Sequence, residues 1–481
     1  MYWPRLWPLT LEYKMLSRRD LLKLSLASVF TPAIAKSYKV ADPQSSINVT
    51  ILSRTDTAYS EHRTPFNKRI TLQPKFIAVC NNEIGIQEAL LFSKRNSLKV
   101  SIKGGGHSFE GFSLNDNGLV IDLSNLQTLQ LEENGSLTVG AGIKLKQIYE
   151  YLLPKGLLLP AGSCGGVGIS GLTLGGGYGL FTRKHGLTCD HLESIKFIDG
   201  KANYHAIGNK QDDYLWASKG GGNGNFYAAS EFNYRLQKSP ENLYAYRFKF
   251  YNLDLQKTLS LAEKWFKESK KLPPTCFSAF VLNHKRLFIL ITDTTEPSEE
   301  LKDIINQLTL IADKVSAPSV KPIEKAVTTY YGRPLPLYFH NISGGFYTDF
   351  DSTKKLLAES FVEILKNPGM LFQINTVGGE MNNPKHISGS AFPHRTFDYL
   401  GEIQCYWDKD SQTSHFSDLI KKLTLTIEEN QINAHYRNYP NLFLKNWESD
   451  YYGSPSNRSR LKAVKHKLDP DNLICHPQSL V

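Results

Sequence analysis

KGGGHSFEG, residues 103–111, and GSCGGVGISGLTLGGGYG, residues 162–179, are the stretches that decide the fold of this 481-residue chain. Each places one nucleophilic side chain, His107 or Cys164, within a run of glycines. Glycine lets the backbone approach a ligand closely and adopt a positive φ, and successive free N–H groups can form a concave nest for a phosphate or an electron-rich ring edge. Two such loops, each with one nucleophile, predict a large anionic cofactor that is held, and can be bonded, at two points.

Length and composition indicate a folded globular protein of two domains. Apolar residues make up 41% of the chain and aromatic residues 11%, as in ordinary globular proteins. The formal net charge of +10 could favour acidic ligands, but solvated surface charge is the better explanation. The sequence has no zinc-finger spacing, arginine-rich arm or basic heptad, which argues against a nucleic-acid partner. Its six cysteines are scattered without a C-x-x-C pair, so no metal site is expected.

The N-terminus resembles an export signal. Paired arginines at Arg18 and Arg19 precede an apolar run from Leu24 to Phe30, and Ala33–Ala35 offers a small-x-small cleavage site. This arrangement predicts a twin-arginine signal peptide over residues 1–35, recognised by the export machinery, and a periplasmic or secreted enzyme. An amphipathic N-terminal helix is the alternative. The apolar run is too short to span a bilayer, so no membrane span is expected.

Local periodicity predicts an α+β domain around the two glycine stretches. Apolar residues at helical spacing predict a helix over about 83–95, and alternation of apolar and polar residues predicts a strand over 98–103. This strand runs directly into the first glycine stretch. Further strands are expected at 119–123 and 137–141, followed by a helix over 145–152.

The pattern changes after about residue 240. Residues 244–251 and 287–292 are typical of strands, whereas 255–272 and 301–315 have helical periodicity. This combination predicts a second domain of antiparallel sheet covered by helices. Leu461, Val464 and Leu468 fall on one helical face and predict a helix near the C-terminus.

The ordered motifs of the chain resemble the berberine-bridge-enzyme-like branch of the vanillyl-alcohol-oxidase (PCMH-type FAD-binding) superfamily of flavin-dependent oxidases. The resemblance covers roughly residues 65–481 and rests on both glycine stretches and on Asp213–Ala217, Gly220–Phe226, Phe392–Arg395, Tyr436–Pro440 and Asp469–Asn472. It implies a two-part FAD-binding domain at 36–240, a substrate-binding domain at 241–430 and a C-terminal segment at 431–481 that returns to the FAD domain.

The resemblance also implies that FAD is bonded covalently through both His107 and Cys164, which match the family's two attachment positions. Taken alone, His107 could be a turn histidine and Cys164 a buried free thiol, although a polar glycine loop can lower the pKa of a thiol. The chain departs from the family at Lys103, where Arg is usual and its planar fork is lost. A second departure is Gly165–Gly166, where the family often has Pro-Thr.

The other expected cofactor contacts come from the same two stretches. Val167 matches a family position beside the reactive flavin carbon, where a small side chain is associated with access for O2; simple packing is the alternative. The glycine clusters fit neither a P-loop nor a dinucleotide fingerprint, and the resemblance implies contacts with the FAD diphosphate and flavin edges instead of tight turns alone. The expected set beside the two anchors is Lys103, Gly104, Gly105, Gly106, Ser108, Val167, Gly168, Gly171, Gly175, Gly176, Gly177 and Gly179.

Four residues are candidates for the catalytic machinery. Oxidation of an alcohol needs a base for the hydroxyl proton, and a tyrosine whose pKa is lowered by a positive charge or by the flavin can serve. Tyr436 and Tyr439 lie in a Tyr-x-Asn-Tyr motif that resembles the family's catalytic segment, with Tyr439 slightly favoured; aromatic core packing is the alternative. Glu402 and Gln404 should share one face of a strand, and Glu402 is either a second base or an exposed carboxylate.

These features predict an exported oxidase with bicovalently bound FAD and a small-molecule substrate. It would oxidise an alcohol or hemiacetal hydroxyl, with a carbohydrate as the leading substrate class, and pass the electrons to O2 to give H2O2. A tailoring oxidase of an aromatic or polycyclic natural product is the first alternative, and a flavin-retaining binding protein with little turnover is the second.

Overall fold

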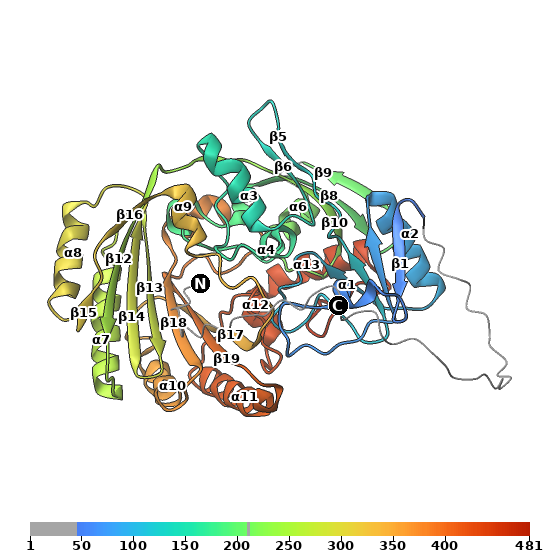
Figure 1. Ribbon diagram of the computed structural model, residues 1–481. Coiled ribbons are helices and arrows are strands. Elements are labelled where there is room, and N and C mark those ends of the chain that lie inside the picture. Colours follow the sequence, from blue (N-terminus) through green and yellow to red (C-terminus); the bar gives the residue numbers. More distant parts are fainter. Residues whose placement is uncertain (1–45, 209–211) are drawn as a thin grey trace, which may run out of the picture.

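The computed structural model describes residues 46–208 and 212–481. The signal peptide predicted at 1–35 lies outside these residues. The chain has the expected α+β fold, and Figure 1 shows two neighbouring halves: a blue-to-green half that carries both glycine stretches and a yellow-to-orange half built on one large sheet. Within the described residues, no helix is both long and apolar enough to cross a membrane.

A four-stranded mixed sheet begins the first half. Its elements are β1 (Val49–Ser53), α1 (Tyr59–Arg63), β2 (Phe76–Cys80), α2 (Glu83–Arg95), β3 (Val100–Lys103) and β4 (Leu119–Asp122). Strands β2 and β3 both run parallel to β4, whereas β1 is antiparallel to β2. Parallel strands need a crossover connection, and α2 provides it between β2 and β3. Asn82 caps this helix by accepting a hydrogen bond from the Gly85 N–H.

A five-stranded antiparallel sheet completes the first half, in the order β5-β6-β10-β8-β9. Its strands are β5 (Leu129–Leu131), β6 (Leu137–Gly140), β8 (Leu192–Asp199), β9 (Tyr204–Ile207) and β10 (Tyr227–Tyr234). The helices beside it are α3 (Leu145–Leu152), α4 (Ile169–Leu174), α5 (Thr182–His185) and α6 (Asp213–Ser218), with short 3₁₀ turns at Leu153–Lys155 and Thr188–His191. Two further two-residue strands, β7 (Leu157–Leu158) and β11 (Gln237–Lys238), pair with each other.

The second half is built on one antiparallel sheet of eight strands, with the central order β12-β14-β13-β18-β19-β17. The strands are β12 (Asn242–Phe250), β13 (Cys276–Asn283), β14 (Arg286–Asp293), β15 (Lys314–Val315), β16 (Ser319–Pro322), β17 (Tyr338–Tyr347), β18 (Met370–Thr376) and β19 (Tyr399–Trp407). Short strands β15 and β16 both pair with β12 at the edge. Antiparallel strands with one face covered by helices are the architecture expected from the sequence.

Helices α7 (Leu255–Ser269), α8 (Glu299–Thr309), α10 (Lys354–Lys366) and α11 (Thr413–Glu429) pack on one face of this sheet through a large apolar cluster. The opposite face of the sheet faces the first half, and α9 (Ile323–Thr328) lies where the two halves meet (Figure 1). Short 3₁₀ turns lie at Gly379–Asn382, Pro384–His386 and Asp410–Gln412. The C-terminal helices α12 (Trp447–Tyr452) and α13 (Pro455–Leu468) return to the first half, where the Val100 and Cys475 main chains are hydrogen-bonded.

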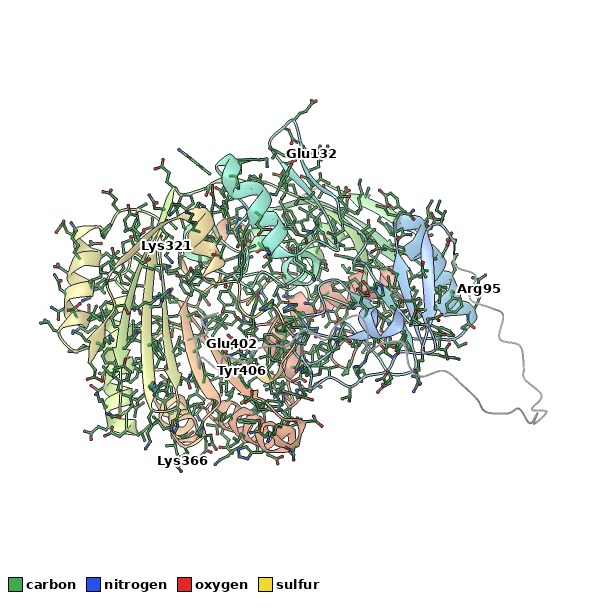
Figure 2. All side chains as sticks on the ribbon, viewed as in Figure 1. Arg95, Glu132, Lys321, Lys366, Glu402 and Tyr406 are labelled. Atoms are coloured by element: carbon green, nitrogen blue, oxygen red, sulfur yellow. The ribbon has the colours of Figure 1, made fainter. Side chains whose placement is uncertain are left out.

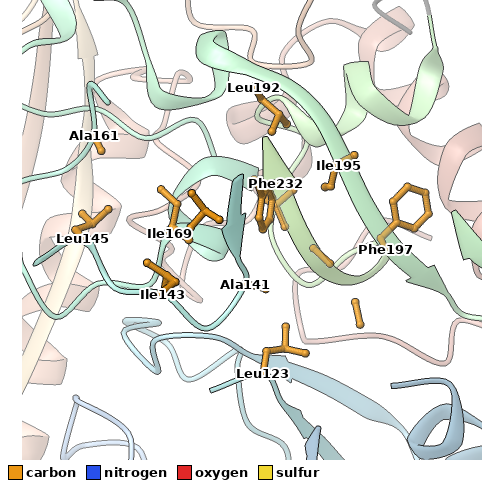
Figure 3. Packing of buried hydrophobic residues seen from close by; sticks show 14 of the residues in the cluster. Leu123, Ala141, Ile143, Leu145, Ala161, Ile169, Leu192, Ile195, Phe197 and Phe232 are labelled. Carbon is orange, nitrogen blue, oxygen red and sulfur yellow. The ribbon is translucent and has the colours of Figure 1, made fainter. Parts of the chain in front are cut away.

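A second apolar cluster packs the elements next to the two glycine stretches against the sheets of the first half. Figure 3 shows its packing between helices and the five-stranded sheet. Ile169 of α4, Leu145 of α3 and Phe232 of β10 are all completely buried in it. The helix that follows Cys164 is therefore fixed by packing, which holds the glycine stretch before it in place.

The structure corrects one predicted element. A helix was expected over 301–315, but α8 ends at Thr309 and residues 314–315 form strand β15. Leu310 and Ile311 extend the apolar pattern without being buried, since Leu310 is 79% exposed. The helix was predicted too long because Leu310 and Ile311 continue the helical apolar pattern although they lie on the surface.

Candidate active site

One cavity lies between the two halves and is lined by both glycine stretches, by strands of the large sheet and by the segment 436–440. It encloses about 1720 Å³ of empty space, part of it open to solvent. His107 and Cys164 both line it, as do Tyr436 and Tyr439. The structure thus brings the two predicted anchors and the predicted Tyr-x-Asn-Tyr pair to a single site.

The two glycine stretches meet main chain to main chain. A Cβ atom on Gly105 would come within 2.3 Å of the Gly168 amide nitrogen, and one on Gly168 within 2.4 Å of the Gly105 nitrogen. Neither position has room for a side chain. The two stretches therefore form one continuous wall of the cavity, which holds both His107 and Cys164.

The His107 ring is held between a stacked aromatic ring and the main chain of a glycine. Its ring lies on the Phe66 ring, with centroids 4.1 Å apart. Its Nε2 atom faces Gly166, where a Cβ would come within 2.8 Å. Burial, assisted by the Lys144 charge, lowers the pKa of His107 to about 3. The imidazole is therefore neutral, which is the nucleophilic form.

Cys164 lies under the segment 330–333, between α9 and β17. The Gly165 N–H donates to the Tyr331 carbonyl at 3.1 Å, and a Cβ on Gly332 would lie 3.4 Å from the Cys164 Sγ. The thiol was expected to have a lowered pKa, but burial raises it. The difference arises because desolvation of the thiolate outweighs the polarity of the glycine loop.

Most of the other expected cofactor residues line the cavity, and four do not. Those that do are Gly104, Gly105, Gly106, Ser108, Val167, Gly168, Gly171 and Gly179. Lys103 instead lies behind the first stretch, where its ammonium pairs with Asp122 at 2.8 Å. A Cβ on Gly175, Gly176 or Gly177 would collide with Asn438, Phe392 or Thr188 respectively. These three glycines serve close internal packing in the structure, and neither they nor Lys103 line the cavity. Their contact with the cofactor stays a prediction.

Tyr439 lines the cavity and is hydrogen-bonded to a second tyrosine. Its hydroxyl is hydrogen-bonded to the Tyr178 hydroxyl at 2.7 Å, and the Asn375 amide donates to Tyr178 at 3.0 Å. Its ring stacks on Phe109, with centroids 5.3 Å apart. Burial and the nearby Glu402 carboxyl raise the pKa of Tyr439 well above its usual value, whereas a lowered pKa was expected. Tyr439 is therefore a neutral phenol that can accept a proton only if it passes one on.

Tyr436 has a different environment from Tyr439. Its hydroxyl accepts hydrogen bonds from the Gly177 N–H at 3.0 Å, the Tyr178 N–H at 3.3 Å and the Asn438 amide at 3.0 Å. Burial raises the pKa of Tyr436 to about 12 although these three donors oppose the rise. Its acceptor capacity is occupied, so Tyr436 positions the segment around Tyr178 instead of taking a proton from substrate.

Glu402 is completely buried, not an exposed carboxylate. Its Oε1 atom accepts a long hydrogen bond of 3.5 Å from Asn341, and its Oε2 atom has no hydrogen-bond partner among the described residues. Burial raises the pKa of Glu402 to about 8, although Gln404, Tyr439 and Asn341 lower it in part. Glu402 is adjacent to Tyr439 but does not itself line the cavity. Figure 2 places Glu402 and Tyr406 near the centre of the molecule.

Comparison with known proteins identifies the family. A family profile described as an FAD binding domain matches residues 74–208, and one described as "berberine and berberine like" matches residues 435–480. An uncharacterized FAD-linked oxidoreductase of Bacillus subtilis (strain 168) is 30% identical over 442 residues, which cover 89% of this chain and 96% of that protein. The chain belongs to the berberine-bridge-enzyme-like FAD-linked oxidoreductases. It is an FAD-dependent enzyme.

Solved structures of berberine-bridge-enzyme-like proteins share the fold. The structure of a chitooligosaccharide oxidase has a TM-score of 0.81 at 23% identity and covers 90% of this chain and 97% of its own. Glucooligosaccharide oxidase from Acremonium strictum, described with a 6-S-cysteinyl, 8α-N1-histidyl FAD, has a TM-score of 0.80 at 21% identity, with coverage of 90% and 97%. At this identity the likeness shows the fold alone.

One wall of the cavity, here called the polar floor, is formed by polar side chains of β17, β18 and β19, and most of them were not expected from the sequence. Gln404 and Gln373 are hydrogen-bonded at 3.3 Å, and Gln373 donates to Asn375 at 2.8 Å. On the other side, Tyr406 donates to Gln404 at 2.9 Å and accepts from Asn341 at 2.8 Å. Only Glu402 and Gln404 were expected here. Of their neighbours, Tyr406 lies two residues after Gln404 on β19. Gln373 and Asn375 on β18 and Asn341 on β17 come from other strands, and no local pattern marks them.

Arg437 also lines the cavity, although the sequence assigned it no role. It is 2% exposed, lines the cavity, donates from Nε to the Tyr452 hydroxyl and lies 3.0 Å from the His476 Nε2. Arginine ion pairs in the described part of the chain involve Arg69, Arg395 and Arg460, and none involves Arg437. A buried guanidinium without an acidic partner is costly. Its position at the cavity fits an anionic ligand.

Proposed function

We propose that the enzyme is an oxidase that bonds FAD through both His107 and Cys164 and oxidises a hydroxyl of a carbohydrate with O2 as acceptor. The observation that carries the proposal is the shared cavity: both nucleophiles line it together with Tyr439, and Glu402 is adjacent to Tyr439. FAD-dependent oxidoreduction is the family's chemistry. The double attachment, the oxygen acceptor and the substrate are the proposed part.

The residues of the cavity fit FAD. Gly104–Gly106 and Gly168 give a concave main-chain surface without side chains, which suits a phosphate or a ring edge. Arg437 would hold the diphosphate, whose charge compensates the buried guanidinium. The neutral His107 imidazole and the Cys164 thiol supply the two nucleophiles. Val167, which also lines this wall, is small enough to leave access for O2.

When bound, FAD supplies the redox chemistry: it accepts a hydride from the carbon that bears the hydroxyl and is reoxidised by O2, which becomes H2O2. The chain itself must remove the hydroxyl proton. Tyr439 lines the cavity and would take that proton while releasing its own phenolic proton to the Glu402 carboxylate beside it. This relay needs no tyrosinate at rest, which agrees with the raised pKa of Tyr439.

The polar floor supports a neutral polyhydroxylated substrate. Amide side chains offer a donor and an acceptor side by side, and Gln373, Asn375 and Asn341 all line the cavity. Neighbouring sugar hydroxyls also offer both functions and can pair with such amides. A curated glucooligosaccharide oxidase of Sarocladium strictum, 26% identical over 489 residues, adds support for a carbohydrate. Oxidation at the reducing-end carbon would give a lactone.

One observation favours the alternative, a tailoring oxidase of an aromatic or polycyclic natural product. Phe277, Leu290 and Ala279 also line the cavity and are apolar. Such a wall would suit a fused ring system at least as well as a sugar.

A hydrogen-peroxide assay of the purified holoenzyme distinguishes these functions. The panel contains reducing mono- and oligosaccharides, phenols, benzylic alcohols and polycyclic alcohols. Peroxide release with sugars alone is the expected result. Release with aromatic or polycyclic alcohols alone would establish the alternative, and no release with any compound would favour a flavin-retaining protein with little turnover.

Export by the twin-arginine pathway is part of the proposal. Arg18 and Arg19, the apolar run and Ala33–Ala35 support it. Replacing both arginines with lysine keeps the charge and should leave an uncleaved precursor in the cytoplasm. Normal export of that double variant would refute the assignment.

A further inference from the structure

The cavity-facing side of the large sheet changes from polar to apolar at one strand boundary. Gln373 and Asn375 of β18 lie beside Val281 and Ala279 of β13 in register. One step across this boundary therefore replaces an amide by a hydrocarbon side chain, twice in succession. β13 and β18 are neighbouring strands of one continuous sheet. The change from polar to apolar side chains therefore runs along the line between these two strands.

The polar side adjoins the catalytic tyrosine. In register, Gln373 of β18 pairs with Glu402 of β19, and Gln404 of β19 pairs with Asn341 of β17. Asn375 is joined through the Tyr178 hydroxyl to Tyr439. The hydroxyl that is oxidised must therefore lie over this side of the sheet.

The apolar side continues the same floor away from Tyr439. Ala279 of β13 pairs in register with Leu290 of β14, and both line the cavity. Phe277, two residues before Ala279, lines it as well, and Tyr330 contributes a further aromatic ring from the segment that follows α9. Ala279 is the smallest of these side chains and lies next to Asn375, so it leaves room at the boundary itself.

We propose that the substrate is a two-part molecule: a polyhydroxylated ring that is oxidised over β18, β19 and β17, joined to an apolar substituent that lies over β13 and β14. The substituent is a flat aromatic or short alkyl group attached away from the oxidised carbon. This inference rests on the proposed carbohydrate oxidation and specifies its substrate class. An unsubstituted sugar would leave the part of the cavity beside Phe277 and Leu290 without an apolar group, and so without the gain from transferring such a group out of water.

The test compares glucose with glucose carrying a benzyl ether at O3, O4 or O6, each with a free reducing end. Burial of a group of this size gives about a 10- to 100-fold gain in affinity. At least one ether should therefore have a kcat/KM at least about tenfold above that of glucose, mainly through KM. The same ether should perturb the flavin absorbance at a correspondingly lower concentration under anaerobic conditions in a variant that lacks the Tyr439 hydroxyl.

Variants at Leu290 locate the effect. Leu290→Ser makes this part of the floor polar and should remove most of the advantage of the benzyl ether, measured as the ratio of kcat/KM for the ether to kcat/KM for glucose. Leu290→Met retains an apolar side chain of similar size and should preserve the advantage. If Leu290→Ser does not fold or load flavin, Ala279→Ser tests the same surface with a smaller change.

Two results would overturn the inference. Equal kcat/KM for glucose and all three ethers would show that the apolar side does not contact substrate, while sugar oxidation would still stand. If Leu290→Ser lowers kcat/KM equally for glucose and for the ether, with normal flavin content, then Leu290 maintains the shape of the pocket and does not contact the substituent. If neither glucose nor any ether is oxidised, the carbohydrate function and this inference both fail.

Discussion

Gly105 and Gly168 lie main chain against main chain, and this contact joins the loop that carries His107 to the loop that carries Cys164. A Cβ on Gly105 would come within 2.3 Å of the Gly168 amide nitrogen. Because the obstacle is backbone, no side-chain rotation can relieve the overlap. Separation of the loops would move the two proposed attachment points relative to each other.

Replacement of Gly105 by alanine should therefore impair flavin loading more than the loss of any single polar contact. Overpacking costs about 1–3 kcal/mol where neighbours can adjust, and here the neighbour is main chain. We expect Gly105→Ala to carry less than about a tenth of the wild-type flavin. Gly389→Ala is the matched control, since a Cβ there would have no heavy atom within 4 Å. Flavin content per protein, from absorbance of purified protein, checks both; normal loading of Gly105→Ala would contradict the role of the contact.

Tyr439→Phe should slow chemistry without loss of flavin. The change removes only the hydroxyl, and a positioned proton acceptor contributes about 10²–10⁴-fold. Anaerobic stopped-flow reduction of the flavin by substrate should slow by about that factor. Tyr436→Phe should instead lower thermal stability, because it leaves the Gly177 and Tyr178 N–H groups without their acceptor. Unchanged reduction in Tyr439→Phe, with collapse in Tyr436→Phe, would reverse the two roles.

The rate of flavin reduction should depend on the ionisation of Glu402. Burial raises the pKa of this carboxyl from its usual value to about 8. Only the carboxylate can receive the proton from Tyr439, and the carboxylate becomes the main form as the pH rises through this pKa. The rate should therefore increase from about pH 6 to about pH 9 and then level off. Glu402→Gln should be slow throughout and lack this rise; an identical pH profile in the variant would remove Glu402 from the relay.

Arg437 should select for the diphosphate of FAD. In the background His107→Ala with Cys164→Ala, where flavin cannot be bonded at these positions, Arg437→Gln should raise the Kd for FAD about 10- to 100-fold. The Kd for riboflavin, which has no phosphate, should not change. Arg460→Gln makes the same charge change outside the cavity lining, where Arg460 pairs with Asp213, and should leave the Kd for FAD unchanged. Equal weakening of FAD and riboflavin would mean that Arg437 supports the fold alone.

Local sequence was sufficient for the elements and motifs whose signals are local. The helix expected over about 83–95 is α2, Glu83–Arg95, because its apolar face and its Asn82 cap lie within one segment. The same holds for His107 and Cys164, which glycine-rich motifs mark and which the structure places in one cavity.

The rest of the site depends on relations that only the folded chain defines. Gln373 and Asn341 belong to the polar floor because of how β17, β18 and β19 pair in register, and local sequence patterns did not reveal this register. Arg437 becomes conspicuous only once its burial and lack of an acidic partner are known. Only the folded chain likewise shows that Lys103, expected from its motif to contact the cofactor, pairs with Asp122 nineteen residues later.

Covalent attachment of FAD to both anchors is the central claim, and peptide mass spectrometry after acid precipitation tests it most directly. The flavin should remain in the pellet of the wild-type protein, and peptides containing His107 and Cys164 should be recovered cross-linked through one flavin. His107→Ala and Cys164→Ala should each retain flavin on the remaining anchor, and only the double variant should release it. Free FAD in the supernatant of the wild-type protein, with both peptides unmodified, would contradict the account.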